Sequence, residues 1–315
     1  MSLRSDEVDV FEASRHRLAA VAYRLLGSAA EAEDAVQETF LRWQGADRDR
    51  IEVPEAWLTK VLTNLCLNQL ASARARREAY IGQWLPEPVL DGDPMLGPAD
   101  TAEQRESVSL AVLRLMERLS PKERAVYVLH EAFGHTHREI AEFLEISESG
   151  SQQLLSRARR RVATGRVRTE IDRATARKVV EEFLSAAATG EVEALVRVLS
   201  EDALGIGDGG GRIPTRRDPI LGATALAKFL RGLFKPTETK RDMLGGRPDV
   251  YPAVVNGAPA LVVAVGDRVA SVIALEMSEG RVSEVLNQSN PEKLARVNER
   301  WRAGGPHGEP LIAGW

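Results

Sequence analysis

Residues 119–162 decide how this chain folds, and they read LSPKERAVYVLHEAFGHTHREIAEFLEISESGSQQLLSRARRRV. Residues 120–123 (SPKE) form a capping box with proline at the first helical position, and residues 136–139 (THRE) form a second one just after Gly134. Ser147 is a candidate for a third N-cap. Apolar residues follow each start signal at helical spacing, so the stretch predicts three short helices joined by tight turns.

Helix, short turn and helix are the parts of a helix-turn-helix module, whose second helix enters the DNA major groove. The last of the three predicted helices presents short polar, amide and guanidinium groups, which are the groups that read base edges and bind phosphates. The candidate DNA-contacting residues are Ser149, Gln152, Gln153, Ser156, Arg157, Arg159 and Arg160. The alternative is a plain helical hairpin with a basic, solvated face, which requires two caps, a turn and an arginine-rich helix to coincide.

Length and composition limit the classes of protein that fit. A chain of 315 residues with 43% hydrophobic residues should form two or three domains with real cores. A net charge of −4 argues against a uniformly basic nucleic-acid binder, although charge is segregated along the chain. Cys66 is the only cysteine, so no internal disulfide is expected, and no motif predicts a metal or cofactor. Without a signal peptide or a long apolar run, we expect a soluble cytoplasmic protein.

The first 80 residues predict a helical unit. Residues 9–26 and 29–43 have helical periodicity, residues 44–54 form a loop, and a long helix begins at Glu55. The second helix leaves an acidic face outside, which is either solvated or a docking face for a basic partner. The third carries amides at Asn64, Asn68 and Gln69 and a basic end at Arg74, Arg76 and Arg77. These groups suit contacts with a nucleic-acid strand, and a charged helix end with a polar stripe is the equal alternative.

Residues 81–104 change character. They contain four prolines and five acidic residues, with no lysine or arginine. Such a segment is too rich in proline for a helix and too polar for a core, so it is predicted to be a linker. Trp84 and Leu85 are apolar for a linker and suggest a local docking point.

The chain after Arg168 predicts an α+β domain. Two helices are expected over 174–189 and 191–199 and a third over 222–235. A glycine cluster at 209–211 lies between the second and the third. Strand-like segments follow at 250–255, 259–265, 268–277 and 281–288, with hairpin signals between the last three. Helices followed by hairpins indicate an antiparallel sheet covered by helices, which can enclose an apolar pocket. The last dozen residues are expected to form a flexible tail.

Together these segments resemble the extracytoplasmic-function class of bacterial sigma factors. The resemblance is carried by residues 32–41 (AEDAVQETFL), by the helix from Trp57 to Asn64 with its basic end, and by 119–159. Residues 84–88 (WLPEP), 208–211 (DGGG) and 290–294 (NPEKL) are similar to a subgroup with a fused SnoaL-like domain. The implied fold is multidomain: two all-α sigma domains, the second a helix-turn-helix, followed by an α+β cone-shaped SnoaL-like domain with a curved antiparallel sheet. The predicted boundaries are 1–80, 81–104 (linker), 105–168, 169–303 and 304–315 (tail).

The resemblance implies a transcription initiation factor that binds core RNA polymerase and promoter DNA. Core polymerase would be bound by Asp34, Gln37, Glu38 and Phe40, although Phe40 is equally well interpreted as internal packing. The helix-turn-helix would read a duplex −35 element through the residues of the third helix given above. A single-stranded −10 element would be held by Trp57, Asn64, Asn68, Arg74, Arg76 and Arg77, with a base captured by the loop at 44–54.

The third domain is expected to regulate the first two within the same chain. The residues predicted to face the linker or the first domain are Trp84, Pro86, Asp208, Gly209, Gly210, Gly211, Asn290, Pro291, Lys293 and Leu294. A small-molecule ligand in the pocket is a further expectation. Catalysis is disfavoured, because Asp202, Asp208 and Glu276 have no histidine partner, metal cluster or nucleophile beside them. For the whole chain, the alternative is a helix-turn-helix regulator with a ligand-binding domain.

Overall fold

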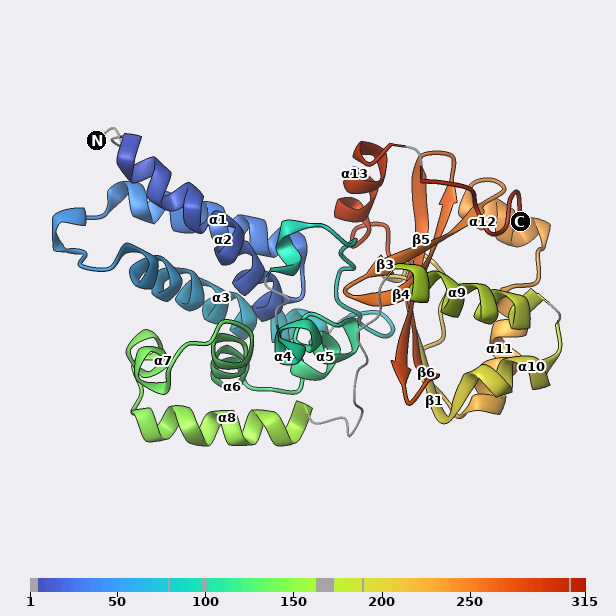
Figure 1. Cartoon of the computed structure of the whole chain (residues 1–315), viewed down its shortest axis with the longest axis horizontal. Coiled ribbons are helices and arrows are strands. Elements are labelled where there is room, and N and C mark those ends of the chain that lie inside the picture. Colours follow the sequence, from blue (N-terminus) through green and yellow to red (C-terminus); the bar gives the residue numbers. More distant parts are fainter. Residues whose placement is uncertain (1–4, 79, 98–100, 163–172, 189, 306) are drawn as a thin grey trace. The chain divides into compact units, whose positions relative to one another are not determined.

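The computed structural model describes residues 5–78, 80–97, 101–162, 173–188, 190–305 and 307–315 (Figure 1). The chain divides into two compact units. The first contains residues 1–79, 92–108 and 112–164, and the second contains residues 80–91, 109–111 and 165–315. The predicted linker is therefore split, because its first half belongs to the second unit. The predicted boundary at 168–169 lies outside the described residues.

The first unit begins with three helices, α1 (Ser5–Leu26), α2 (Ala29–Gly45) and α3 (Pro54–Glu78). Gly27 separates α1 from α2 with φ of 69°, a conformation that favours glycine, and the Ser28 hydroxyl then accepts a hydrogen bond from Glu31 N at 3.1 Å. Leu25 of α1 and Leu58 of α3 are fully buried. The loop predicted at 44–54 contains one short 3-10 turn, η1 (Arg48–Arg50).

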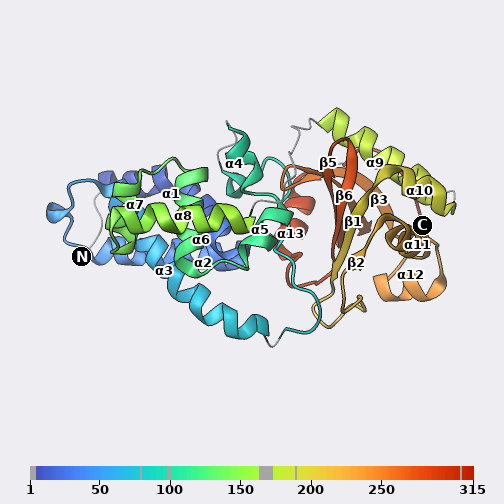
Figure 2. The same ribbon diagram turned by 90° about the horizontal axis from the view of Figure 1, so that it is seen from below.

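The helix-turn-helix forms as predicted. It consists of α6 (Pro121–Tyr127) with its π-helical continuation η3 (Val128–Ala132), then α7 (His137–Leu144) and α8 (Glu148–Val162), and both Figures 1 and 2 show α8 beside α6 and α7. Both capping boxes are present, at Ser120 and Thr136. Ser147 accepts a hydrogen bond from Gly150 N at 3.0 Å, as expected of an N-cap.

The second half of the predicted linker is not extended. It forms η2 (Pro94–Leu96) and α4 (Ala102–Glu106), which lead to α5 (Leu110–Met116). The Asp93 and Thr101 side chains cap the first two of these, so proline and acids here begin short helices instead of preventing them.

Two buried arginines hold the first unit together. The Arg24 guanidinium of α1 donates to Ser107 Oγ at 2.8 Å, and the Arg124 Nε of α6 donates to the Arg24 carbonyl at 3.2 Å. Arg124 also pairs with Glu117. Burial lowers the pKa of Arg24 to about 10. The three-helix bundle and the helix-turn-helix, which the sequence predicted as separate domains, are thus parts of one compact unit.

The second unit is built on a six-stranded sheet with strand order β2-β1-β6-β5-β4-β3. The strands are β1 (Leu199–Asp208), β2 (Ile220–Leu221), β3 (Asp249–Val255), β4 (Ala258–Val265), β5 (Arg268–Ser278) and β6 (Arg281–Gln288). Strands β3 to β6 form the predicted antiparallel series. The sheet as a whole is mixed, because β1 runs parallel to β6. Hairpin signals predict pairing only between consecutive strands. The sequence analysis therefore did not predict the pairing of β1 with β6.

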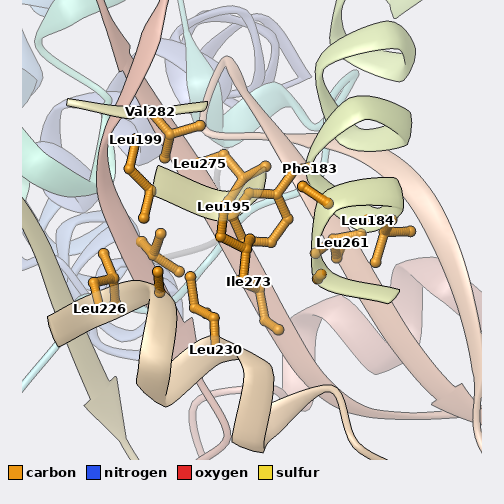
Figure 3. Packing of buried hydrophobic residues seen from close by; sticks show 14 of the residues in the cluster. Phe183, Leu184, Leu195, Leu199, Leu226, Leu230, Leu261, Ile273, Leu275 and Val282 are labelled. Atoms are coloured by element: carbon orange, nitrogen blue, oxygen red, sulfur yellow. The ribbon is translucent and has the colours of Figure 1, made fainter. Parts of the chain in front are cut away.

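Helices pack on both faces of the sheet. Helices α9 (Arg173–Ala188), α10 (Val192–Val198) and α11 (Ala223–Leu233) pack on one face, and α13 (Ala295–Ala303) packs on β5 from the other. Figure 3 shows Phe183 of α9, Leu195 of α10 and Leu230 of α11 meeting Ile273 and Leu275 in the first of these cores. The opposite face buries Leu85, Leu294 and Trp301, so a linker residue is part of a domain core.

The segment after α13 was predicted to be flexible, and this prediction is wrong for residues 307–315. Val250 N donates to the Ile312 carbonyl at 2.8 Å, and Leu311 N donates to the Val250 carbonyl at 2.8 Å. Trp315 Nε1 donates to the Phe234 carbonyl at 2.9 Å. Strand β3 is an edge strand with open backbone groups, which this segment pairs. A short helix that the sequence analysis did not predict, α12 (Glu238–Leu244), lies between α11 and β3.

Candidate nucleic-acid interface and linker site

Helix α8 has one exposed polar face. At about 100° per residue, the seven predicted DNA-contacting positions fall within an arc of about 160°. All seven are exposed, whereas the buried positions of α8 are Ser151, Leu155, Ala158 and Val162. The structure therefore presents the predicted set together on the side of α8 that faces away from the core of the unit.

The arginines of α8 differ in their partners. Arg159 is paired with Glu131 at 2.7 Å, and Glu123 receives Arg161 at 2.6 Å and Arg157 at 3.7 Å. Burial raises the pKa of Glu123, but the hydrogen bonds from Ser120 and the charges of the two arginines outweigh it and leave that pKa below its ordinary value. Within the described residues Arg160 has no ion pair, so its guanidinium is open to a phosphate.

The acidic face of α2 is also exposed. Asp34 and Gln37 are open to solvent, and Glu38 pairs with Arg42 at 3.0 Å. Leu41 lies on the same face with 53% of its surface exposed, which is unusual for leucine. Phe40 is half-buried with its ring 4.8 Å from that of Phe11, so it contributes to internal packing.

Helix α3 carries the remaining candidates. The Trp57 ring lies 5.6 Å from the Trp43 ring, which fixes its orientation. Asn64 is half-buried and Asn68 is exposed. Trp57, Asn64 and Asn68 fall on one side of the helix because their spacings of seven and four residues are close to whole turns. The side chains of Arg74, Arg76 and Arg77 lie outside the described residues.

In the second unit, the first half of the linker lies against the end of β1. The Asp208 side chain is completely buried. Its Oδ2 accepts hydrogen bonds from Leu85 N at 2.9 Å and Lys293 Nζ at 2.7 Å, and its Oδ1 accepts from the Tyr80 hydroxyl at 2.6 Å and Gly210 N at 3.0 Å. Gln288 Nε2 is a fifth donor, to Oδ2 at 3.4 Å. A buried carboxylate requires such donors, and two of the five come from residues 80–91.

Lys293 completes the contact from the other side. Its ammonium donates to the Leu85 carbonyl at 2.8 Å as well as to Asp208, and it lies 4.4 Å from the Trp84 ring centre and 4.6 Å from that of Tyr80. One lysine thus combines an ion pair with two cation–π contacts. We call Asp208, Gln288, Asn290 and Lys293 the linker clamp.

The two amides of the clamp bind linker polar groups. Gln288 Nε2 donates to the Pro86 carbonyl at 3.2 Å, and Asn290 Nδ2 donates to the Tyr80 hydroxyl at 2.9 Å. Burial, followed by the Asp208 carboxylate, raises the pKa of Tyr80, which keeps its hydroxyl protonated as a donor. The Tyr80 hydroxyl, the Leu85 N–H and carbonyl and the Pro86 carbonyl therefore all have hydrogen-bond partners in the C-terminal domain.

The linker then continues along β3. Val89 N donates to Asn256 Oδ1 at 2.8 Å, Asn256 N donates to the Val89 carbonyl at 2.9 Å, and Asp91 N donates to the Val254 carbonyl at 3.0 Å. Leu90 forms an antiparallel bridge with Val255. Residues 80–91 are therefore held at both ends, by the clamp and by the end of β3.

The glycines after Asp208 are needed for this geometry. Gly210 has φ of 62°, and a Cβ at that position would lie 2.4 Å from the Asn290 side chain. A Cβ on Gly209 would lie 1.9 Å from the Ile213 carbonyl oxygen. At Gly211, φ is 72° and the nearest neighbour is Ile81 of the linker. Larger residues would displace the loop from both the clamp and the linker.

The sequence predicted part of this site and missed the rest. Of the predicted residues, Asp208 contacts Leu85, Lys293 contacts Trp84 and Leu85, and Asn290 contacts Tyr80. Pro86 is contacted by Gln288, Gly210 N donates to Asp208, and Leu294 is buried in the core beneath. Tyr80, Gln288 and Asn256 were not predicted. Gln288 is two residues from Asn290 and Tyr80 adjoins the linker, so proximity to the motifs was the only available signal.

A separate pocket of about 540 Å³ lies on the other side of the sheet, between α11, α12 and the strands. Of the acids considered as general bases, Asp202 is exposed, Asp208 is engaged in the clamp, and none of the three lines the pocket. Among the described residues, no cluster of histidine, cysteine and acidic side chains could hold a metal ion, and no helix is long and apolar enough to cross a membrane.

Comparison with known proteins agrees with this architecture. The model of Sigma-70 region 2 matches residues 10–76, and that of Sigma-70 region 4 matches residues 109–162. The chain is 35% identical over 309 residues to the ECF RNA polymerase sigma factor SigJ of Mycobacterium tuberculosis, covering 96% of this chain and 97% of that protein. It is 32% identical over 290 residues to the probable ECF sigma factor SigI of the same species, covering 90% and 93%.

A solved structure extends the match to the whole fold. The crystal structure of the M. tuberculosis extracytoplasmic function sigma factor SigJ superposes with a TM-score of 0.70 at 33% identity, covering 92% of this chain and 98% of that one. The match includes the α+β domain as well as the helical domains, so the alternative of an ordinary helix-turn-helix regulator is not favoured. This chain belongs to the extracytoplasmic-function class of RNA polymerase sigma factors, non-enzymatic proteins that direct promoter-specific transcription initiation.

Proposed function

We propose that the C-terminal domain controls this sigma factor in cis by binding and releasing the first half of the linker. The observation that carries the proposal is the buried Asp208 carboxylate, which accepts hydrogen bonds from Leu85 of the linker, from the adjoining Tyr80 and from Lys293 of its own domain. Charge-assisted hydrogen bonds in a buried site are the strong kind, so this contact can compete with other partners for the linker.

The length of the bound segment gives the control a physical basis. The second unit holds the twelve residues 80–91. Extended chain spans at most about 3.3–3.6 Å per residue, so their release would free up to about 40 Å of reach between α3 and the helix-turn-helix. Clamped linker would restrain the separation of the −10-binding and −35-binding parts in addition to the contacts of Arg24 and Arg124, and release of the linker would remove its share of this restraint.

The DNA and polymerase contacts follow from the exposed faces. We propose that the polar face of α8 reads the −35 duplex, with Gln152 and Gln153 toward bases and Arg160 toward a phosphate. The side of α3 that carries Trp57, Asn64 and Asn68 would contact the melted −10 strand. The exposed face of α2, with Asp34, Gln37, Glu38 and the apolar Leu41, would dock on core polymerase, since an exposed apolar residue with a charged rim is typical of an interface.

Run-off transcription with purified core polymerase tests the control. The full chain is compared with Asp208→Asn and Lys293→Met on a promoter that the protein recognises. Because the clamped linker restrains the two DNA-binding parts, both variants should raise initiation several-fold at limiting sigma concentration. Glu292→Gln is the matched control, because it removes an exposed carboxylate in the same segment whose partner is Arg212. Equal activity of all four proteins would contradict cis control, and a loss in the two clamp variants would contradict restraint.

A small-molecule ligand for the C-terminal domain is also proposed, because its 540 Å³ pocket is within the range of about 300–1,000 Å³ that ligand sites occupy. Such a ligand would act on initiation through the clamp.

A further inference from the structure

The pocket has apolar walls. Its lining includes Phe229, Leu233, Met243 and Ile273, and Trp315 forms part of the wall beside Phe234. Phe229 and Met243 are 38% and 44% exposed, which is high for side chains of this size and type. An apolar occupant would cover this surface and gain the free energy of removing it from water.

A polar group lies on the strand side of the pocket. Ser271 Oγ donates to Asn287 Oδ1 at 2.5 Å, and Ser289 Oγ lies 3.1 Å from Ser271 Oγ and 3.3 Å from Asn287 Oδ1. Both serines are buried. The hydroxyls of Ser271 and Ser289 thus both donate hydrogen bonds to the side-chain oxygen of Asn287. Among the described residues, the Asn287 Nδ2 amide has no hydrogen-bond acceptor, although its side chain lines the pocket.

The charges around the pocket argue against a charged occupant in its interior. The Lys240 ammonium donates to three backbone carbonyls, those of Gly232, Leu233 and Lys235, at 2.5 to 3.0 Å, which uses all three of its protons. Lys228 is on the exposed side of α11, at the rim. No carboxylate is present in the described lining.

We infer that this pocket binds a neutral, mainly apolar molecule with one oxygen acceptor, such as a ketone or ester carbonyl, which accepts a hydrogen bond from Asn287 Nδ2. The inference rests on the proposed function, since it names the class of ligand that would act on the clamp. Two connections join the pocket to the clamp. Asn287 lines the pocket and the next residue, Gln288, binds the linker, while the Gly209 carbonyl accepts a hydrogen bond from Ile213, a pocket residue, at 3.0 Å.

The test uses the full chain without polymerase and the fluorophore Prodan, a neutral dimethylaminonaphthalene that carries a propionyl ketone. Its emission shifts to the blue in apolar surroundings, so a titration reports binding directly. The wild type should bind it saturably. Asn287→Leu should weaken binding by about tenfold, the value expected when one hydrogen bond is lost, with little effect on the parent dimethylaminonaphthalene that lacks the ketone.

A second pair of variants keeps the test independent of Asn287. Gly232 lines the pocket from α11 with ordinary helical backbone, and apart from its chain neighbours and the adjacent backbone of its own helix no atom lies within 4 Å of a Cβ built on it. Gly232→Leu should therefore fill the pocket and abolish binding while its helix stays folded, and Gly232→Ala should bind within about twofold of wild type. Saturable binding that Gly232→Leu does not reduce would overturn the site, as would no binding by the wild type.

Hydrogen exchange in the same samples tests the link to the clamp. Saturating Prodan should change the exchange rate of the Leu85 amide at least threefold in wild type and leave it unchanged in Gly232→Leu. Binding without such a change would overturn the assignment as an effector site. A failure of cis control itself would instead appear in the transcription assay, which contains no probe.

Discussion

Asp208 Oδ2 and Lys293 Nζ lie 2.7 Å apart, and both hold the backbone of Leu85, the carboxylate through its N–H and the ammonium through its carbonyl. The pair therefore binds both backbone polar groups of a single linker residue. Neither ion is buried without a partner of opposite charge, which makes the linker part of the electrostatic balance of the C-terminal domain.

Breaking this pair should destabilise the second unit and loosen the linker. Removing one partner of a buried ion pair costs about 3–5 kcal/mol, and we expect the lower part of that range for Asp208→Asn because Lys293 retains some exposure. The double variant Asp208→Asn/Lys293→Met should cost less than the sum of the two single variants. Denaturant unfolding of the four proteins measures this coupling, and strict additivity would show that the two side chains act independently.

Gly210→Ala should release the linker by a different route. The added Cβ would lie 2.4 Å from the Asn290 side chain at a φ of 62°, so the loop must move away from Asn290 and Asp208. Proteolysis within residues 80–91 should become faster by tenfold or more. Gly92→Ala is a suitable comparison, because it has φ of 80° with no atom within 4 Å of a Cβ, and it isolates the cost of backbone strain. Equal rates in the two variants would argue against a role for the Asn290 contact.

On α8, two substitutions should separate base reading from phosphate binding. Gln153→Ala should cost about 1–3 kcal/mol and relax the preference at one −35 position, and Arg160→Ala should weaken binding to all sequences and reduce the salt slope by about one. Binding of the polymerase-bound chain to promoter variants at several salt concentrations measures both. If Arg160→Ala changed sequence preference but left the salt slope unchanged, its assignment to a phosphate would be wrong.

Acid should destabilise the first unit through Glu123. The pKa of this carboxyl is lowered in the folded chain, so the folded state binds a proton less readily than the unfolded state. Its contribution to the free energy of unfolding is therefore complete above the unfolded pKa of about 4.3 and is lost as pH falls through the lower, folded value. The stability difference between wild type and Glu123→Gln should be largest near neutral pH and shrink below about pH 4. A difference independent of pH would contradict this.

The features of the fold that the sequence predicted are those that depend on residues close together in the chain. Caps at Ser120, Thr136 and Ser147 and the hairpin turns after β4 and β5 depend on neighbouring residues, and they formed as expected. The parallel pairing of β1 with β6 and the docking of residues 307–315 on β3 join residues far apart in the sequence, for which no local pattern exists. The clamp was predicted in outline because three motifs were recognised, whereas Tyr80 and Gln288 became visible only from their hydrogen bonds.

The clamp is the centre of this account, and residue-resolved hydrogen exchange of the full chain, alone and bound to core polymerase, tests it most directly. The Leu85 and Val89 amides donate to Asp208 and Asn256 in the clamped form, so both should be protected in the free chain. In the polymerase complex they should exchange at least tenfold faster or acquire a different pattern of protection, while the β4 and β5 amides stay unchanged. Identical protection of Leu85 and Val89 in both states would mean that the linker is never released, and it would contradict control through the clamp.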